Sequence, residues 1–438
     1  MNTIAPHNTA VSSGVELGFR IVNPHCLGRI VQLSETHQVI AASDIHDDSG
    51  NKLWARGAPV SRDLHDKLLR RSLAHPLEAS LSIEGGATME SIVADALARI
   101  DEHEVFAGLA GSARARGLLR DMRRMPLPGP VKLLLTSARE HKQSSYAHGL
   151  AAMVVCAGLA AQLELSAHDA NMLIVAAMVH DIGEIYINPE YLNADQPVSL
   201  AAWKHVASHP CVGHAFVTEF TTFPSAVAAC VLHHHERLDG SGYPFQLGAS
   251  ALDRLSSILA VADSVSAIVL RGGCGIRKRL EVALRIVPEE FDRRSVSVIN
   301  AALRDIRADA CDAGQGNCIK RVVPMLRQLG EARAAADALA AAGGSAAIDA
   351  CGRYALSILG HIEKSLRATG VFDLSQLATI ESDPQVVSEI CLIVPEVSWR
   401  LINLARNLHM RIEKSGNADE LARVSGLIAA LDPPRAAG

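Results

Sequence analysis

The stretch HDIGE at residues 180–184, followed by HHHERLDGSGYP at residues 233–244, decides how this chain is interpreted. The adjacent His180 and Asp181 offer a nitrogen and a carboxylate to the same metal ion. The later run adds more imidazole nitrogens and ends in a turn rich in glycine. Mixed imidazole and carboxylate ligands suit Fe, Mn or Zn better than Mg or Ca, which prefer oxygen ligands. The two stretches therefore predict a transition-metal site.

The sequence around these stretches has a helical character. Hydrophobic residues make up 49% of the 438 residues and aromatic residues only 4%, and stretches rich in alanine and leucine recur. This composition favours a mainly α protein. Ser166, with Asp169 three residues later, predicts the start of the helix that carries His180 and Asp181 near its end. Ser199 predicts the start of the next helix, which presents His209 just before a proline.

The chain divides into three predicted parts. Residues 1–125 are expected to form a small α+β regulatory module. Three prolines within residues 126–130 stop any regular element and open the central metal-binding domain, residues 126–330. Residues 331–438 are expected to form a helical C-terminal extension, with a linker or loosely packed join within residues 308–350.

The α+β prediction for the first part depends on local signals. Arg29–Leu33 and Gln38–Ala42 are short β-prone runs, and Asp47–Asn51 is a strong turn signal. Lys52–Arg56 is the expected returning strand, and Ser61 is the expected N-cap of a following helix.

Charge and cysteine content limit the partners and the compartment. The formal net charge of -5 argues against a nucleic-acid polymer or an anionic membrane as a partner. The nine cysteines are scattered, odd in number and without a CxxC pair, which favours reduced thiols over a disulfide framework. No secretory signal and no apolar run long enough to span a membrane is found. We therefore expect a cytoplasmic protein.

The quoted strings closely resemble the HD-GYP family, bacterial phosphodiesterases that degrade cyclic di-GMP. The resemblance implies an HD-type helical domain with two divalent metal ions, Fe or Mn. Two ions about 3.5–4 Å apart supply a nucleophile and neutralise charge on the phosphoryl oxygens. Carried over onto this sequence, the family pattern implies seven metal ligands, with Asp181 bridging both ions. They are His148, His180, Asp181, His209, His234, His235 and Asp263. His233 lies outside the pattern, although the register within the triple histidine run is open by one residue.

The glycine-rich turn has its own predicted role. Gly240 and Gly242 let the backbone turn tightly and approach a ligand closely, while Glu236 and Asp239 are expected to orient ligand histidines. In the family this loop is linked to substrate selection and to protein partners. The residues expected to contact substrate are Gly242, Tyr243, Arg277 and Lys278.

Two positions depart from the family pattern. The family carries HD-x-G-K, and Glu184 stands here in place of the lysine, beside the catalytic Asp181. Glu184 either faces the cluster and takes part in catalysis as a further carboxylate, or it points to solvent and only weakens the site. Members with a third metal carry a glutamate where this chain has Ser144, so we expect two metals rather than three.

The resemblance implies hydrolysis of cyclic di-GMP to pGpG, to GMP, or to both. One alternative is a catalytically weak or inactive module that binds metal and nucleotide and signals by protein contact, which the glutamate at position 184 favours. A second alternative is an HD-type hydrolase of another nucleotide. Each of these three functions is compatible with a homodimer.

Overall fold

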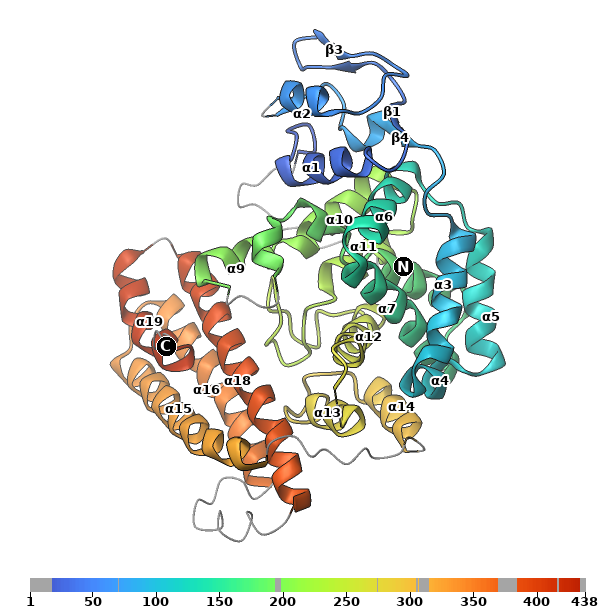
Figure 1. Ribbon diagram of the computed structural model, residues 1–438. Helices are drawn as coiled ribbons and strands as arrows, with labels where there is room; N and C mark the ends of the chain where they lie inside the picture. Colours follow the sequence, from blue (N-terminus) through green and yellow to red (C-terminus); the bar gives the residue numbers. More distant parts are fainter. Residues whose placement is uncertain are drawn as a thin grey trace, which may run out of the picture.

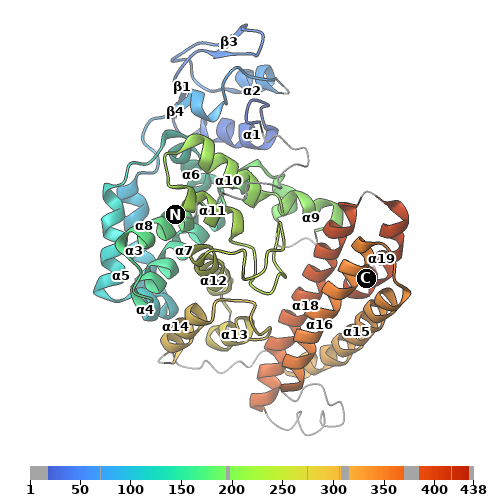
Figure 2. The same cartoon turned by 180° about the vertical axis from the view of Figure 1, so that it is seen from behind.

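The computed structural model describes residues 18–69, 71–193, 198–273, 275–304, 306, 315–368, 384–415 and 417–433. Helices dominate the described chain, which confirms the mainly α prediction. A small α+β part lies against one end of a central helical part, and a bundle of long helices lies along another side of it (Figures 1 and 2). The boundaries at residues 125 and 330 stay predictions.

The N-terminal part combines short helices with two small antiparallel sheets. Its elements are α1 Pro24–Leu33, β1 Val39–Ala41, β2 Ile45–His46, β3 Lys52–Trp54, α2 Arg62–Leu68, the 3-10 turn η1 Glu78–Ser80 and β4 Leu81–Ile83. Strand β1 pairs with β4, and β2 pairs with β3 across the predicted turn. The Ser61 hydroxyl accepts from the Leu64 N–H, which confirms the predicted cap.

The strand-like interpretation of Arg29–Leu33 was wrong, because these residues lie in α1. The Asn23 side chain accepts from the N–H groups of His25 and Cys26, and Pro24 occupies the first turn. This cap starts a helix that continues through the β-branched residues, since Ile30 and Val31 lie on its buried face. A strong helix start outweighs the local β propensity.

The central part is built around α7. Its elements are α3 Met89–Glu102, α4 Glu104–Ala110, α5 Ala113–Asp121, η2 Met122–Arg124, α6 Gly129–His141, α7 Gln143–Gln162, α8 Ala167–Val179, η3 Ile182–Tyr186, η4 Pro189–Leu192, α9 Leu200–Val206, α10 His209–Phe220, α11 Ser225–His233, α12 Arg254–Leu270, α13 Ile276–Ala283 and α14 Arg293–Leu303. Helix α7 is the one described helix long and apolar enough to cross a membrane, and most of it is buried here among α3, α4, α5, α8 and α12.

Local signals set the helix starts that matter for the site. The side chains of Ser166 and Ser199 cap α8 and α9 as predicted. Pro130 lies in the first turn of α6, so the proline-rich run opens this helix, although α3, α4 and α5 of the central part come before it. A side chain at Gly183 would clash with the backbone carbonyl of His209. The glycine therefore allows η3 to lie directly against the start of α10.

The C-terminal part is a bundle of α15 Gln315–Ala342, α16 Ala346–Ala368, α18 Pro384–Glu413 and α19 Ala418–Leu431, with its own apolar core. Of the segment in which a linker or join was predicted, residues 315–342 and 346–350 are helical, and the join among the described residues is limited to residues 343–345. Residues 308–314 lie outside the described residues. The expectation of reduced thiols agrees with the free cysteines at 26, 156, 211, 230 and 351 but is wrong at Cys391, which is disulfide-bonded.

Candidate metal centre

Five segments of the central part bring histidines and aspartates to one place. His148 lies on α7, and His180 and Asp181 follow the end of α8. His209 is the first residue of α10, and Asp263 lies on α12. His234 and His235 follow the last residue of α11. The structure thus brings together all seven residues that the sequence proposed as ligands.

The seven residues form two groups. Asp181, His209, His234 and His235 make one, and His148, His180 and Asp263 make the other; within each group one ligand atom per residue lies within 4.8 Å of the others.

Asp181 faces both groups through its two oxygens. Its Oδ1 lies 3.3 Å from His209 Nε2 and 3.5 Å from His234 Nε2. Its Oδ2 lies 3.2 Å from His180 Nε2 and 3.7 Å from His148 Nε2. A carboxylate placed in this way has one oxygen available to each group, as a bridging ligand requires.

The imidazole hydrogen bonds fit a cation in this cluster. The Nδ1 atoms of His180, His209 and His234 donate to backbone carbonyls at 2.9, 2.8 and 2.7 Å. This bond leaves Nε2 as the nitrogen with a free lone pair. The Nε2 atoms of His209 and His234 lie 3.2 Å apart. Two lone pairs at that distance repel each other unless a proton or a metal ion lies between them.

The pKa shifts differ across the cluster. Burial lowers the pKa values of His180 and His209, but Asp181 outweighs it and raises both, whereas the shifts of His235 and Asp263 favour the forms that bind metal. Burial and the neighbouring His234 hold the pKa of His235 well below its usual range. Burial raises the pKa of Asp263, but His235 and His148 outweigh it and hold that pKa well below its usual range. Neutral imidazole and ionised carboxylate are the forms in which these side chains bind metal ions.

Glu184 lies beside the cluster but in neither ligand group. Its Oε2 accepts from Lys142 Nζ at 2.5 Å and from Ser145 Oγ at 3.1 Å. With 19% of its side chain exposed, Glu184 does not point to solvent, so that expectation was wrong. The partner Lys142, at the junction of α6 and α7, was not anticipated. It could not be, because nothing in the local sequence pairs two residues so far apart.

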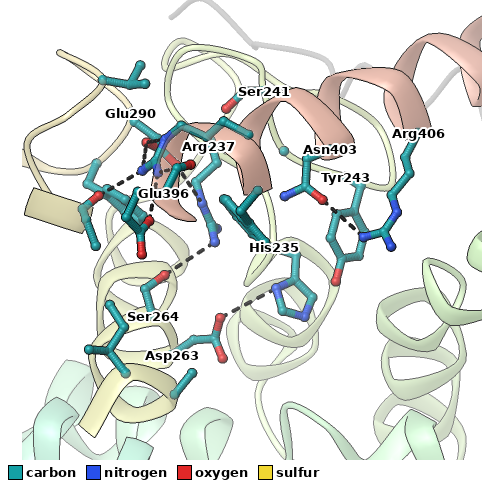
Figure 3. Close-up of a pocket in the computed structure, with 18 of the residues that line it drawn as sticks. His235, Arg237, Ser241, Tyr243, Asp263, Ser264, Glu290, Glu396, Asn403 and Arg406 are labelled. Carbon is teal, nitrogen blue, oxygen red and sulfur yellow. Dashed lines mark hydrogen bonds and ion pairs between the residues drawn. The ribbon is translucent and has the colours of Figure 1, made fainter. Parts of the chain in front are cut away.

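The cluster opens into a cavity of about 640 Å³ between the central part and the C-terminal bundle. Gly242 and Tyr243 line it together with Asp181, His235 and Asp263. Figure 3 shows Tyr243, His235 and Asp263 around it. The Tyr243 ring stacks on His235, with centroids 4.6 Å apart.

Arg277 and Lys278 are not among the residues that line this cavity. The Arg277 guanidinium instead binds the Glu281 carboxylate and the backbone carbonyls of Arg304 and Ile306. Their predicted contact with substrate therefore has no support from the geometry and stays a prediction.

Glu236 holds the glycine-rich loop rather than a ligand histidine. Its buried carboxylate accepts the N–H groups of Phe245, Gln246 and Leu247 at 2.7, 3.2 and 2.9 Å. A side chain at Gly242 would collide with the Glu236 backbone. The loop thus packs so closely against the backbone of residues 235–237 that position 242 requires glycine.

Sequence reasoning missed several residues that line the cavity. Arg237 is buried and reaches Ser264 and Glu290 (Figure 3). It follows the HHHE run directly, so its position was a usable signal. Asn403 and Arg406 come from α18. Their sequence context, an ordinary amphipathic helix far from the motif, carried no signal.

Comparison with known proteins agrees with this geometry. Residues 132–294 match the HD domain family. A cyclic di-GMP phosphodiesterase of Pseudomonas aeruginosa, PA4108, is 30% identical over 158 residues, 36% of this chain and 38% of that protein. The response regulator RpfG of Xanthomonas campestris, also a cyclic di-GMP phosphodiesterase, is 33% identical over 137 residues, 31% of this chain and 36% of that protein.

Other relatives have a different named substrate. A 3'3'-cGAMP-specific phosphodiesterase of Vibrio cholerae is 29% identical over 139 residues, 32% of each chain.

Among solved structures, Bd1817 of Bdellovibrio bacteriovorus, described as an HDG"Y"P protein, is 18% identical, with a TM-score of 0.35 over 49% of this chain and 70% of that one. The chain thus spans about a third of the length of these curated relatives.

Proposed function

Residues 132–294 match the HD domain family, and from this premise we propose that they form a domain of the HD-GYP kind and that the protein is a metal-dependent phosphodiesterase that hydrolyses cyclic di-GMP to pGpG, to GMP, or to both. The observation that carries the proposal is the pair of ligand groups joined by Asp181. A single structural metal would need only one of these groups.

The two groups of candidate ligands would each hold one metal ion. His148, His180 and Asp263 would hold one divalent ion, and His209, His234 and His235 the other, with Asp181 between them. Bound metal ions would lower the pKa of water and neutralise charge on the phosphoryl oxygens; Fe or Mn suits this mixed set. Tyr243, stacked on His235, forms the side of the cavity where a nucleotide base or sugar would lie.

Glu184 enters this proposal as a positioning residue. Its carboxylate binds the Lys142 ammonium at a small second cavity that Asp181 also lines. The chain therefore has a lysine at a cavity that the candidate bridging aspartate also lines, although this lysine comes from a different segment than the HD-x-G-K pattern uses.

The test is turnover by the metal-loaded protein. Protein purified anaerobically with Fe or Mn should convert cyclic di-GMP to pGpG or GMP, followed by chromatography, and Asp181→Ala should abolish the conversion. The same assay with 3'3'-cGAMP decides between the two substrates named for the relatives. Absence of product from both, with two metals bound per chain, would refute the phosphodiesterase.

A second candidate is a module that binds metal and cyclic dinucleotide without turnover and signals by contact. The acidic residue at position 184 favours it, because a carboxylate opposes a dianionic substrate. Its ion pair with Lys142 offsets that charge, which is why we place the enzyme first. We propose that such a module would act in the cytoplasm. A protein partner or a second copy would contact the glycine-rich loop away from Ser241, because the Ser241 carbonyl already accepts a hydrogen bond from Asn407 of α18.

A further inference from the structure

The cavity has a second wall that does not belong to the HD domain. Helix α18 runs along the cavity opposite the metal ligands, and Asn403 and Arg406 project from it towards Tyr243 (Figure 3). The HD domain match ends at residue 294, so this wall is supplied by the C-terminal bundle.

A continuous row of ring contacts joins the metal centre to this wall. Tyr243 stacks on the candidate ligand His235, with ring centroids 4.6 Å apart and planes at 27°. The Trp203 ring meets Tyr243 edge to face at 5.2 Å. The guanidinium carbon of Arg406 lies 4.1 Å from the centre of the Trp203 ring. Stacking on an aromatic face holds an arginine in one orientation while its N–H groups stay available in the ring plane.

The buried arginines of the cavity other than Arg406 lie close to carboxylates. Arg400 is buried and pairs with Glu290 and Glu396. Arg237 lies near Glu290 as well. Arg271, at the rim, is solvent-exposed.

Within the described residues, Arg406 has no carboxylate at ion-pair distance, although Asp432 acts on it from farther away. Its Nη1 donates to Asn403 Oδ1 at 3.3 Å, and its Nε is buried without a hydrogen-bond partner. A half-buried guanidinium with unused donors is costly unless an anion completes it.

We infer that Arg406 binds the phosphate of the cyclic dinucleotide that is not being hydrolysed. This inference rests on the proposed function. A cyclic dinucleotide carries two phosphodiester groups, and when one lies at the metal ligands the other needs a cation elsewhere in the same cavity. The planar fork of an arginine matches a phosphate with two parallel hydrogen bonds.

The experiment compares Arg406→Gln with a matched control on the same helix. Arg411 stacks on Tyr354 at the same 4.1 Å as Arg406 on Trp203, and its Nε also lacks a partner, but it does not line the cavity. Arg411→Gln therefore reproduces the loss of a stacked arginine from α18 that does not itself line the cavity, although its ring partner Tyr354 does. Two substrates are used: cyclic di-GMP, and bis(p-nitrophenyl) phosphate, which has a single phosphodiester.

Arg406→Gln should raise KM for cyclic di-GMP about 10- to 100-fold, because a charge-assisted hydrogen bond of about 1.5–3 kcal/mol is lost. Turnover of bis(p-nitrophenyl) phosphate should stay within about twofold, and Arg406→Lys should retain part of the affinity since it keeps the charge without the fork. The Kd for a phosphorothioate analogue of cyclic di-GMP, measured by calorimetry, should rise by the same factor as KM. Arg411→Gln should leave all these values unchanged.

Three results would overturn the inference. Unchanged KM and Kd in Arg406→Gln, with an active wild type, would remove Arg406 while leaving the proposed function intact. An equal loss with both substrates would mean that Arg406 supports the metal centre or the fold. A wild type that neither binds nor hydrolyses cyclic di-GMP would refute the proposed function and the inference together.

Discussion

The Lys142 ammonium lies 2.5 Å from the Glu184 carboxylate, and each side chain is about four-fifths buried, with 21% and 19% exposed. The pair joins the α6–α7 junction to the turn that follows His180 and Asp181. The pair therefore anchors η3, the turn directly after two candidate metal ligands, to the start of α7.

Breaking this pair from either side should destabilise the protein. Glu184→Lys places two ammonium groups together, and we expect a loss of about 2–3 kcal/mol in the free energy of unfolding, because a largely buried charge loses its partner. The exchanged pair Lys142→Glu with Glu184→Lys should recover at least half of that loss. Urea denaturation of the four proteins gives the coupling energy directly. Additive losses in the double variant would contradict the importance of the pair.

Removal of metal should lower the melting temperature. A ligand that binds only the folded protein stabilises it by about 2.7 kcal/mol at a hundred times its Kd. Treatment with EDTA should therefore lower Tm by about 5 °C or more, and Mn should restore it, as followed by scanning fluorimetry with metal content from elemental analysis. Asp181→Ala should show a much smaller response to EDTA. A wild type with bound metal whose Tm ignores EDTA would argue against the site as a folded-state ligand.

Glu236 should be required for the shape of the glycine-rich loop. Three N–H groups converge on its carboxylate, so Glu236→Ala leaves three donors without an acceptor. We expect a loss of about 2–4 kcal/mol and faster protease cleavage within residues 238–248. Glu219→Ala, at an exposed position of α10, is the control and should change stability by less than about 0.5 kcal/mol. Equal effects of the two substitutions would show that the convergent hydrogen bonds contribute little.

Arg400 should hold the bundle against the central part. Its guanidinium donates to Glu290 at 2.8 Å, to Glu396 at 2.9 Å and to the Ala283 carbonyl at 2.8 Å. Arg400→Met leaves the buried Glu290 carboxylate with only the more distant Arg237 and leaves the partly exposed Glu396 without its partner, and should cost about 3–5 kcal/mol. Adding Glu290→Gln should recover part of the loss, because one stranded charge is removed. Chemical denaturation measures both, and a cost below about 1 kcal/mol for Arg400→Met would refute the role.

The sequence was informative wherever the signal was local. Ser61, Ser166 and Ser199 cap the helices that they were expected to cap, because capping depends on a few neighbouring residues. The seven proposed metal ligands also lie together in the structure, in two adjacent groups, because the order and spacing of the motifs place them at neighbouring ends and faces of the packed helices.

Pairings between distant segments were beyond sequence reasoning. Lys142 and Glu184 are far apart in the chain, and Arg406 reaches the cavity only because α18 packs across it. Arg29–Leu33 failed for a different reason: its β-branched residues favour a strand, but the cap at Asn23 and the buried face of α1 outweigh that preference.

The two walls of the cavity have separate origins in the chain. All the candidate ligands lie between His148 and Asp263, whereas the facing side chains belong to α16 and α18. If the cavity admits a cyclic dinucleotide as proposed, changes in the bundle would alter which ligand it accepts without replacing any candidate metal ligand. Selectivity could then be redesigned on a segment separate from the one that carries the candidate metal centre.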